Sequence, residues 1–232
     1  MSFLNHLISG ISLGSIYAII ALGYTMVYGI AKMLNFAHGD VIMVGGYMCF
    51  CATTYLGWPA WMGVVLAVIV CTALGVVIER LAYKPLRMAP SLAVLITAIG
   101  VSYFLQNAAL LIFGSQQMAY PTLVKLPGFT VGGVHVDGIT VLTLAVTAAL
   151  MIALTLFIDK TKLGKAMRAV SEDKNAATLM GISVDRTITL TFAIGSALAA
   201  FASMFYGMTY VYIKPTTGAM PGIKAFTAAV FG

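Results

Sequence analysis

The sequence predicts an all-α polytopic membrane protein, from its apolar content, its scarcity of charge and its long apolar runs. Of its 232 residues 61% are hydrophobic and only 9% are charged, whereas soluble domains carry about 25% charged residues. Seven acidic and thirteen basic side chains cannot cover a globule of this size. A disordered chain would be poor in apolar residues. The net charge of +6 lies in no basic stripe with interleaved aromatic residues, so we expect no nucleic-acid partner.

Six apolar runs are long enough, or nearly so, to cross a bilayer. A spanning helix needs about 20 apolar residues, because roughly 30 Å of hydrocarbon is crossed at 1.5 Å per residue. Lipid offers no hydrogen bonds to backbone groups, so these segments must be helices. The predicted spans are residues 7–30, 41–57, 61–79, 91–113, 139–158 and 187–213.

A further apolar run, residues 225–232, begins after Lys224 and stops after eight residues. Eight residues cannot cross a bilayer. We expect it to be the start of a further, truncated span, so that residues 1–232 form a single transmembrane domain.

The basic residues predict the orientation. Alternate connecting segments 31–40, 80–90 and 159–186 hold ten of the thirteen basic residues, and the other segments hold three. Basic loops stay in the cytoplasm, so we expect these three segments there, with the N-terminus and the loop 114–138 outside.

The segment 35–40, Asn-Phe-Ala-His-Gly-Asp, interrupts two apolar runs. One interpretation is a short cytoplasmic turn in which Asn35 or Asp40 caps the next helix. The other is a broken helix whose positive N-terminal end faces a solute path. The second interpretation would place Asn35, His38, Gly39 and Asp40 on the path.

Gln106 and Asn107 lie two-thirds of the way along the fourth span. Amides inside a membrane hydrogen-bond to a neighbouring helix or line a solute path, and we keep both interpretations.

No catalytic, cofactor or metal site is expected. Residues 10–14 match Gly-x-Ser-x-Gly, but they lie inside an apolar helix, whereas a nucleophile elbow follows a strand. Gly164-Lys165 is followed by Ala166, so there is no P-loop for ATP. The histidines and cysteines lack metal-ligand spacing.

Small residues recur every four positions in three spans, which allows close helix packing or a dimerisation face. These stripes are Gly10, Gly14 and Ala18; Ala67, Cys71 and Gly75; and Gly195, Ala199, Ser203 and Gly207.

The external loop 114–138 contains two alternating runs around Gly132-Gly133. This pattern predicts a small β-hairpin with a type I′ turn. The hairpin either docks a partner or caps the bundle.

The cytoplasmic segment 159–186 is longer than a connection needs to be. Apolar residues recur near helical spacing, with charged side chains on other faces. Charges of both signs suit a protein partner better than an anionic lipid surface. We interpret it as an interfacial amphipathic helix or a helix that docks into a cytoplasmic partner. The apolar positions are Leu163, Met167, Val170 and Ala177.

This segment resembles the coupling loop of ABC importer permeases, whose motif is Glu-Ala-Ala, three residues, then Gly. Here the motif is Asn175-Ala176-Ala177 followed by Gly181, with Asn175 in place of the acid. With the order of segments 35–40, 114–138 and 159–186 on the spans, the whole chain is similar to bacterial high-affinity branched-chain amino acid permeases.

The resemblance implies a transport subunit, not an enzyme, in the bacterial inner membrane. It also implies import of Leu, Ile or Val driven by two cytoplasmic ATPases, with a second, related permease and a periplasmic binding protein as partners. The residues expected to couple to the ATPase are Arg168, Glu172, Asp173, Asn175, Ala176, Ala177 and Gly181. Those expected on the translocation path are Asn35, His38, Gly39, Asp40, Gln106 and Asn107.

Two alternatives stay open. One is a permease of the same superfamily for urea or short amides. The other is an ion-coupled carrier, which needs a titratable group at membrane depth. Only Asp40 and Glu79 come near that depth, and we expect both at cytoplasmic ends of spans. A membrane-embedded enzyme would need an acid–base constellation that the sequence lacks.

Overall fold

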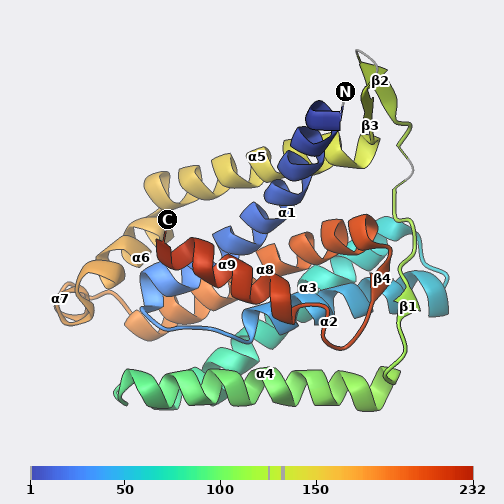
Figure 1. The fold of residues 1–232 in the computed structure, drawn as a ribbon. Helices are drawn as coiled ribbons and strands as arrows, with labels where there is room; N and C mark the ends of the chain where they lie inside the picture. Colours follow the sequence, from blue (N-terminus) through green and yellow to red (C-terminus); the bar gives the residue numbers. More distant parts are fainter. Residues whose placement is uncertain (1, 125, 132–133, 232) are drawn as a thin grey trace.

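Five helices are long and apolar enough to cross a membrane in the computed structural model, which describes residues 2–124, 126–131 and 134–231. Figure 1 shows them as a helical bundle, which makes the chain an all-α membrane protein. The five helices are α1 (Ser2–Ala31), α3 (Ala60–Ile78), α4 (Ser91–Phe113), α5 (Gly138–Lys160) and α8 (Val184–Tyr210). Helix α3 continues through the π-helical turn Glu79–Tyr83 and the 3-10 turn Lys84–Leu86.

Two predicted spans have different limits in the structure. The run 41–57 is not among the five: α2 covers only His38–Phe50, followed by the π-helical turn Cys51–Tyr55. The run 187–213 was predicted three residues too far along the chain, since α8 begins at Val184. Helix α8 ends at Tyr210 because Val211 adopts a left-handed φ of 59°, which an α-helix does not accommodate.

Helix α8 forms the centre of the bundle. In its most apolar stretch 67% of the residues are buried, against 11% in α5. It packs against α1, α2 and α3. Gly195 and Ser203 of the third stripe lie against Gly23 of α1 and Gly45 of α2, and Gly75 of the second stripe lies against α8. The first stripe differs, since a Cβ atom on Gly10 or Gly14 would meet no described atom within 4 Å apart from its chain neighbours and the nearby backbone of its own helix.

The strands lie at one end of the bundle and two short helices lie at the other (Figure 1). Strand β2 (Phe129–Val131) pairs antiparallel with β3 (Val134–Val136), while the predicted turn at 132–133 lies outside the described residues. The sequence did not predict the other antiparallel pair, β1 (Met118–Ala119) with β4 (Tyr212–Ile213).

The segment 159–186 forms two helices, α6 (Lys162–Glu172) and α7 (Lys174–Leu179), so the prediction of one helix is wrong. Asp173 separates them because its backbone is extended, with φ −148° and ψ 115°. The run expected after Lys224 is the second half of α9 (Ala219–Phe231), which begins six residues before Ala225.

Candidate functional site

Helix α2 begins inside the bundle. After α1 the chain runs without helical structure to His38, whose side chain lies against Gly23 of α1; a Cβ atom on Gly23 would be 2.9 Å from His38 Cε1. Gly23 lies eight residues before the end of α1, about 12 Å along the helix axis. The alternative in which Asn35 or Asp40 caps the helix is wrong, because the N-cap is Ala37 without a side-chain hydrogen bond.

Helix α9 begins beside the start of α2. Gly218 immediately precedes α9, and its backbone is in such close contact with Gly39 that a Cβ atom on either residue would overlap the carbonyl group of the other. Only glycine allows this approach. Two helix N-termini, each the positive end of a helix dipole, therefore lie next to each other.

Asp40 is buried at the start of α2 and bonded to α4. Its side chain is 1% exposed, and Oδ1 accepts a hydrogen bond of 2.9 Å from Gln106 Nε2. Gln106 also donates to Ser102 Oγ, at 3.1 Å. Gln106 lies fifteen residues beyond Ser91, about 22 Å along α4. Asp40 is therefore deep in the bundle, and the expectation that it lies at a cytoplasmic span end is wrong.

The other predicted path residues separate into two groups. His38 is 1% exposed, and Asn35 is buried and accepts a hydrogen bond of 3.0 Å at Oδ1 from the Tyr83 hydroxyl. Asn107 is exposed, and within the described residues its side chain donates to the carbonyl of Tyr103 in its own helix. The structure thus groups Asn35, His38, Gly39, Asp40 and Gln106 around the start of α2 and places Asn107 elsewhere.

Helix α6 buries one face and exposes the two of its residues that were expected to couple to the ATPase. Met167 and Val170 are buried, as their spacing predicts, whereas Leu163 is 49% exposed and was wrongly placed on that face. Arg168 and Glu172 are exposed. Arg168 forms an ion pair with Asp159 at 2.9 Å.

Asp173 is the N-cap of α7. Its Oδ1 accepts hydrogen bonds from the backbone N–H groups of Asn175, at 2.7 Å, and Ala176, at 3.1 Å. A carboxylate here accepts hydrogen bonds from two otherwise unpaired backbone donors. Its negative charge also interacts favourably with the positive end of the helix dipole. Asn175 and Ala176 themselves are exposed.

The glycine of the motif ends α7. Gly181 has a left-handed φ of 81°, its N–H donates to Thr178 O at 2.9 Å, and the N–H of Ile182 donates to Ala177 O at 3.0 Å. These two bonds define a Schellman cap. Ala177 is 3% exposed, so it packs inward, unlike the exposed Asn175 and Ala176 before it.

Two apolar side chains next to this cap are exposed and were not predicted. Leu179 is 88% and Met180 is 82% exposed at the end of α7. The sequence signal was two apolar residues directly before a helix-ending glycine, outside the apolar spacing of the segment.

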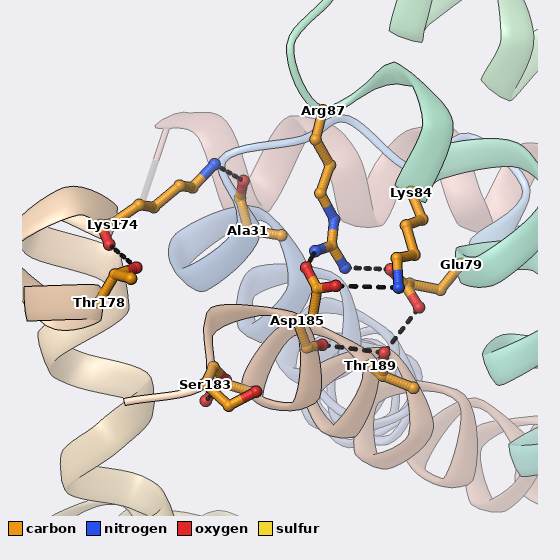
Figure 2. Close-up of polar contacts among 10 residues, drawn as sticks. Ala31, Glu79, Lys84, Arg87, Lys174, Thr178, Ser183, Asp185 and Thr189 are labelled. Atoms are coloured by element: carbon orange, nitrogen blue, oxygen red, sulfur yellow. Dashed lines mark hydrogen bonds and ion pairs between the residues drawn. The ribbon is translucent and has the colours of Figure 1, made fainter. Parts of the chain in front are cut away.

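Helix α7 is bonded to the end of α1 (Figure 2). Lys174 Nζ donates to the carbonyl of Ala31, the last residue of α1, at 3.1 Å. A cation suits the negative end of a helix dipole. Burial of the ammonium group, together with the charges of Arg87 and Lys32, lowers the pKa of Lys174.

A second cluster joins α3 to α8 (Figure 2). Arg87 forms ion pairs with the fully buried Glu79 and with Asp185. Thr189 of α8 donates to Glu79 Oε2 at 2.8 Å, and Lys84 lies 2.9 Å from Asp185. Within the described chain, no group of three or more His, Cys, Asp or Glu residues could hold a metal ion.

Comparisons of the sequence with known proteins identify the family. Residues 6–232 match the family described as branched-chain amino acid transport system / permease component. The chain is 48% identical to the high-affinity branched-chain amino acid transport system permease protein BraD of Pseudomonas aeruginosa, covering 99% of this chain and 79% of the relative.

Two further relatives carry related names. The chain is 45% identical to the Escherichia coli permease protein LivH, covering 99% of this chain and 79% of LivH. It is 26% identical to the Escherichia coli permease protein LivM, covering 88% of this chain and 53% of LivM. No solved structure gives a significant match. The chain belongs to the family of permease components of branched-chain amino acid transport systems.

Proposed function

We propose that this chain is the membrane-spanning permease subunit of an ATP-driven importer that moves Leu, Ile and Val across the bacterial inner membrane. The family match and the relatives named as branched-chain amino acid permeases support it. The weaker similarity to LivM supports a second, related permease as the partner in the membrane. Two cytoplasmic ATPases and a periplasmic binding protein complete the proposed assembly.

The observation that carries this proposal is the exposed end of α7. Leu179 and Met180 are 88% and 82% exposed, at the end of the bundle opposite the strands (Figure 1). Exposed apolar side chains surrounded by polar residues mark interaction sites. The charges of both signs on α6 favour a protein partner over a lipid surface. The ATPase contacts we propose here are Arg168, Glu172, Asn175 and Ala176, with Asp173, Ala177 and Gly181 holding α7 in shape.

The same geometry suggests how ATP hydrolysis displaces the residues that line the solute path. An ATPase that shifts α7 pulls on Lys174 and, through its hydrogen bond, on Ala31 at the end of α1. The chain from Ala31 leads within seven residues to His38, where α2 begins inside the bundle. Displacement of α7 is thereby transmitted to the cluster around Asp40, which we propose lines the path.

We further propose six membrane crossings, the second made by the segment 32–37 and α2 together, followed by α9. In this orientation the N-terminus is periplasmic and segment 159–186 is cytoplasmic. In a background with the three native cysteines replaced, a membrane-impermeant maleimide should label Phe3→Cys in spheroplasts. It should label Leu179→Cys only after permeabilisation, and the reverse pattern would invert the orientation.

Reconstitution in vesicles tests the function. With its partner permease, ATPases and binding protein, the chain should give leucine uptake that requires both ATP and the binding protein. Uptake driven by an ion gradient alone would instead identify an ion-coupled carrier, and ATP-dependent uptake of urea without leucine would identify an amide permease. The family match favours neither alternative.

One variant pair tests the coupling surface. Leu179→Asp should abolish co-purification of the ATPases, because it removes an exposed apolar contact. Val211→Asp is the matched control: this residue is 58% exposed, at the other end of α8, and should leave co-purification intact. Stoichiometric ATPase binding by Leu179→Asp would contradict the proposed surface.

A further inference from the structure

A cavity of about 160 Å³ lies where the end of α1, the start of α4 and the start of α7 meet. It exceeds the roughly 15 Å³ that one water needs and falls short of the roughly 300 Å³ of pockets for drug-sized ligands, so it suits a small group. Three of its eight described lining residues are cationic, and none of these eight is acidic. Its charged and hydroxyl-bearing lining residues are Lys32, Arg87, Ser91 and Lys174.

The cations around the cavity outnumber the carboxylates that pair with them. The two carboxylates of the cluster that joins α3 to α8 pair with Arg87 and Lys84. Among the described residues, no carboxylate forms an ion pair with Lys32 or Lys174. Burial and the charges of Arg87 and Lys32 lower the pKa of Lys174, so the cations repel one another across this space. The cavity therefore carries uncompensated positive charge.

Helix α4 begins at the same cavity. Ser91, its first residue, is exposed and lines the wall. The first N–H groups of a helix have no acceptor within the helix, and they form the positive end of its dipole. The N-cap, Pro90, supplies no side-chain hydrogen bond to them. An anion at the start of α4 would supply the missing acceptor.

We propose that this cavity binds a phosphate group, which joins the end of α1 to the starts of α4 and α7. A phosphate monoester carries a charge of about −1.5 to −2 at pH 7 and three acceptor oxygens. This matches two lysines without ion-pair partners and the start of a helix. An ammonium group has three donors, so Lys174 can bind the phosphate and keep its hydrogen bond to Ala31. The group is either a free phosphate or the headgroup of an anionic lipid, which basic pockets also bind.

Binding of inorganic phosphate to the purified full chain in neutral detergent tests the site. Labelled phosphate should bind saturably in equilibrium dialysis, and it should raise the melting temperature above that in sodium chloride of equal ionic strength. Lys32→Asn should weaken binding at least tenfold, because it removes a charged hydrogen-bond donor. Its melting temperature without phosphate should not fall, since asparagine tolerates the left-handed φ of 57° at this position. Lys165→Gln, exposed on α6 outside the cavity lining, is the matched control and should bind phosphate like the wild type.

A second variant places an anion in the cavity. Ser91→Asp puts a carboxylate at the start of α4, where it interacts favourably with the helix dipole. This variant should melt at a higher temperature than the wild type in the absence of phosphate, and it should no longer bind phosphate. A lower melting temperature together with unchanged phosphate binding would contradict the site.

Mixed micelles identify the source of the phosphate group. Phosphatidic acid in phosphatidylcholine micelles should bind more tightly than inorganic phosphate if the ligand is a lipid headgroup, and less tightly if it is a free phosphate. Either result supports the site when Lys32→Asn weakens it. Equal binding by the wild type and Lys32→Asn, or binding of neither probe by the wild type, would overturn the site. The chain is tested without its partners, so these outcomes are independent of the proposed function.

Discussion

Gly75 of α3 lies directly against Ser196 of α8. A Cβ atom on Gly75 would be 2.6 Å from Ser196 Cβ, closer than real side chains approach. Two turns further along α8 the contact recurs, since a Cβ atom on Gly45 of α2 would be 2.7 Å from Ser203 Oγ. Small residues allow helix backbones to approach in lipid, and here they hold α2 and α3 against α8.

Gly75→Ala should therefore destabilise the bundle. An added methyl group in a packed helix contact costs about 1–3 kcal/mol, which exceeds the gain of up to about 1 kcal/mol in helix propensity. Gly10→Ala is the control, because a Cβ atom there would meet no described atom within 4 Å apart from its chain neighbours and the nearby backbone of its own helix. Thermal unfolding in detergent should show a lower melting temperature for Gly75→Ala and an equal or higher one for Gly10→Ala. Equal melting of both variants would contradict the packing.

The long peripheral helices could be predicted almost to the residue. Helix α4 was predicted and found at Ser91–Phe113, because lipid forces an apolar run of that length to be helical. The burial of Met167 and Val170 on α6 also followed from their spacing. In such segments the local pattern determines the structure.

Contacts between residues far apart in sequence could not be predicted. The Asp40–Gln106 bond joins residues 66 positions apart, and the depth at which α2 begins depends on α1 and α9. The β1–β4 pair consists of two-residue strands, too short to show alternation. The break at Asp173 did have a local signal, since aspartate is a favoured N-cap, but the surrounding residues also suit a continuous helix.

Removing Arg87 should be severely destabilising. Arg87→Ala leaves Glu79, which is 0% exposed, with only Thr189 as a partner among the contacts of Figure 2. Breaking a buried ion pair costs about 3–5 kcal/mol, because a charge stays buried without compensation.

Lys84→Ala is the control for this prediction. Among the contacts of the described residues it removes the pair with Asp185. The side chains of Lys84 and Asp185 are 50% and 56% exposed, and exposed ion pairs contribute about 0–1 kcal/mol. Chemical denaturation in detergent should show a much larger loss in the free energy of unfolding for Arg87→Ala than for Lys84→Ala. A loss for Arg87→Ala no larger than that for Lys84→Ala would show that the Glu79 pair is unimportant.

Gly181→Ala should weaken the end of α7. The residue has a φ of 81°, a conformation that costs other L-residues about 1–2 kcal/mol. The variant should lower ATPase binding, because Leu179 and Met180 lose their fixed position beside the cap. Gly181→Asn should restore most of the binding, since asparagine tolerates this conformation. Equal binding by the alanine and asparagine variants would argue against the cap.

Lys174→Gln should separate ATP hydrolysis from transport. The change removes the charged donor that holds α7 to Ala31, at a cost of about 1 kcal/mol for a partly exposed hydrogen bond, yet it leaves Leu179 and Met180 free to contact the ATPases. We expect normal co-purification and ATPase activity but about fivefold fewer leucine molecules imported per ATP hydrolysed. Lys165→Gln, exposed on α6, controls for the loss of one positive charge and should keep the wild-type ratio. If the Lys174 variant also keeps that ratio, motion reaches the path by another route than the contact between α7 and α1.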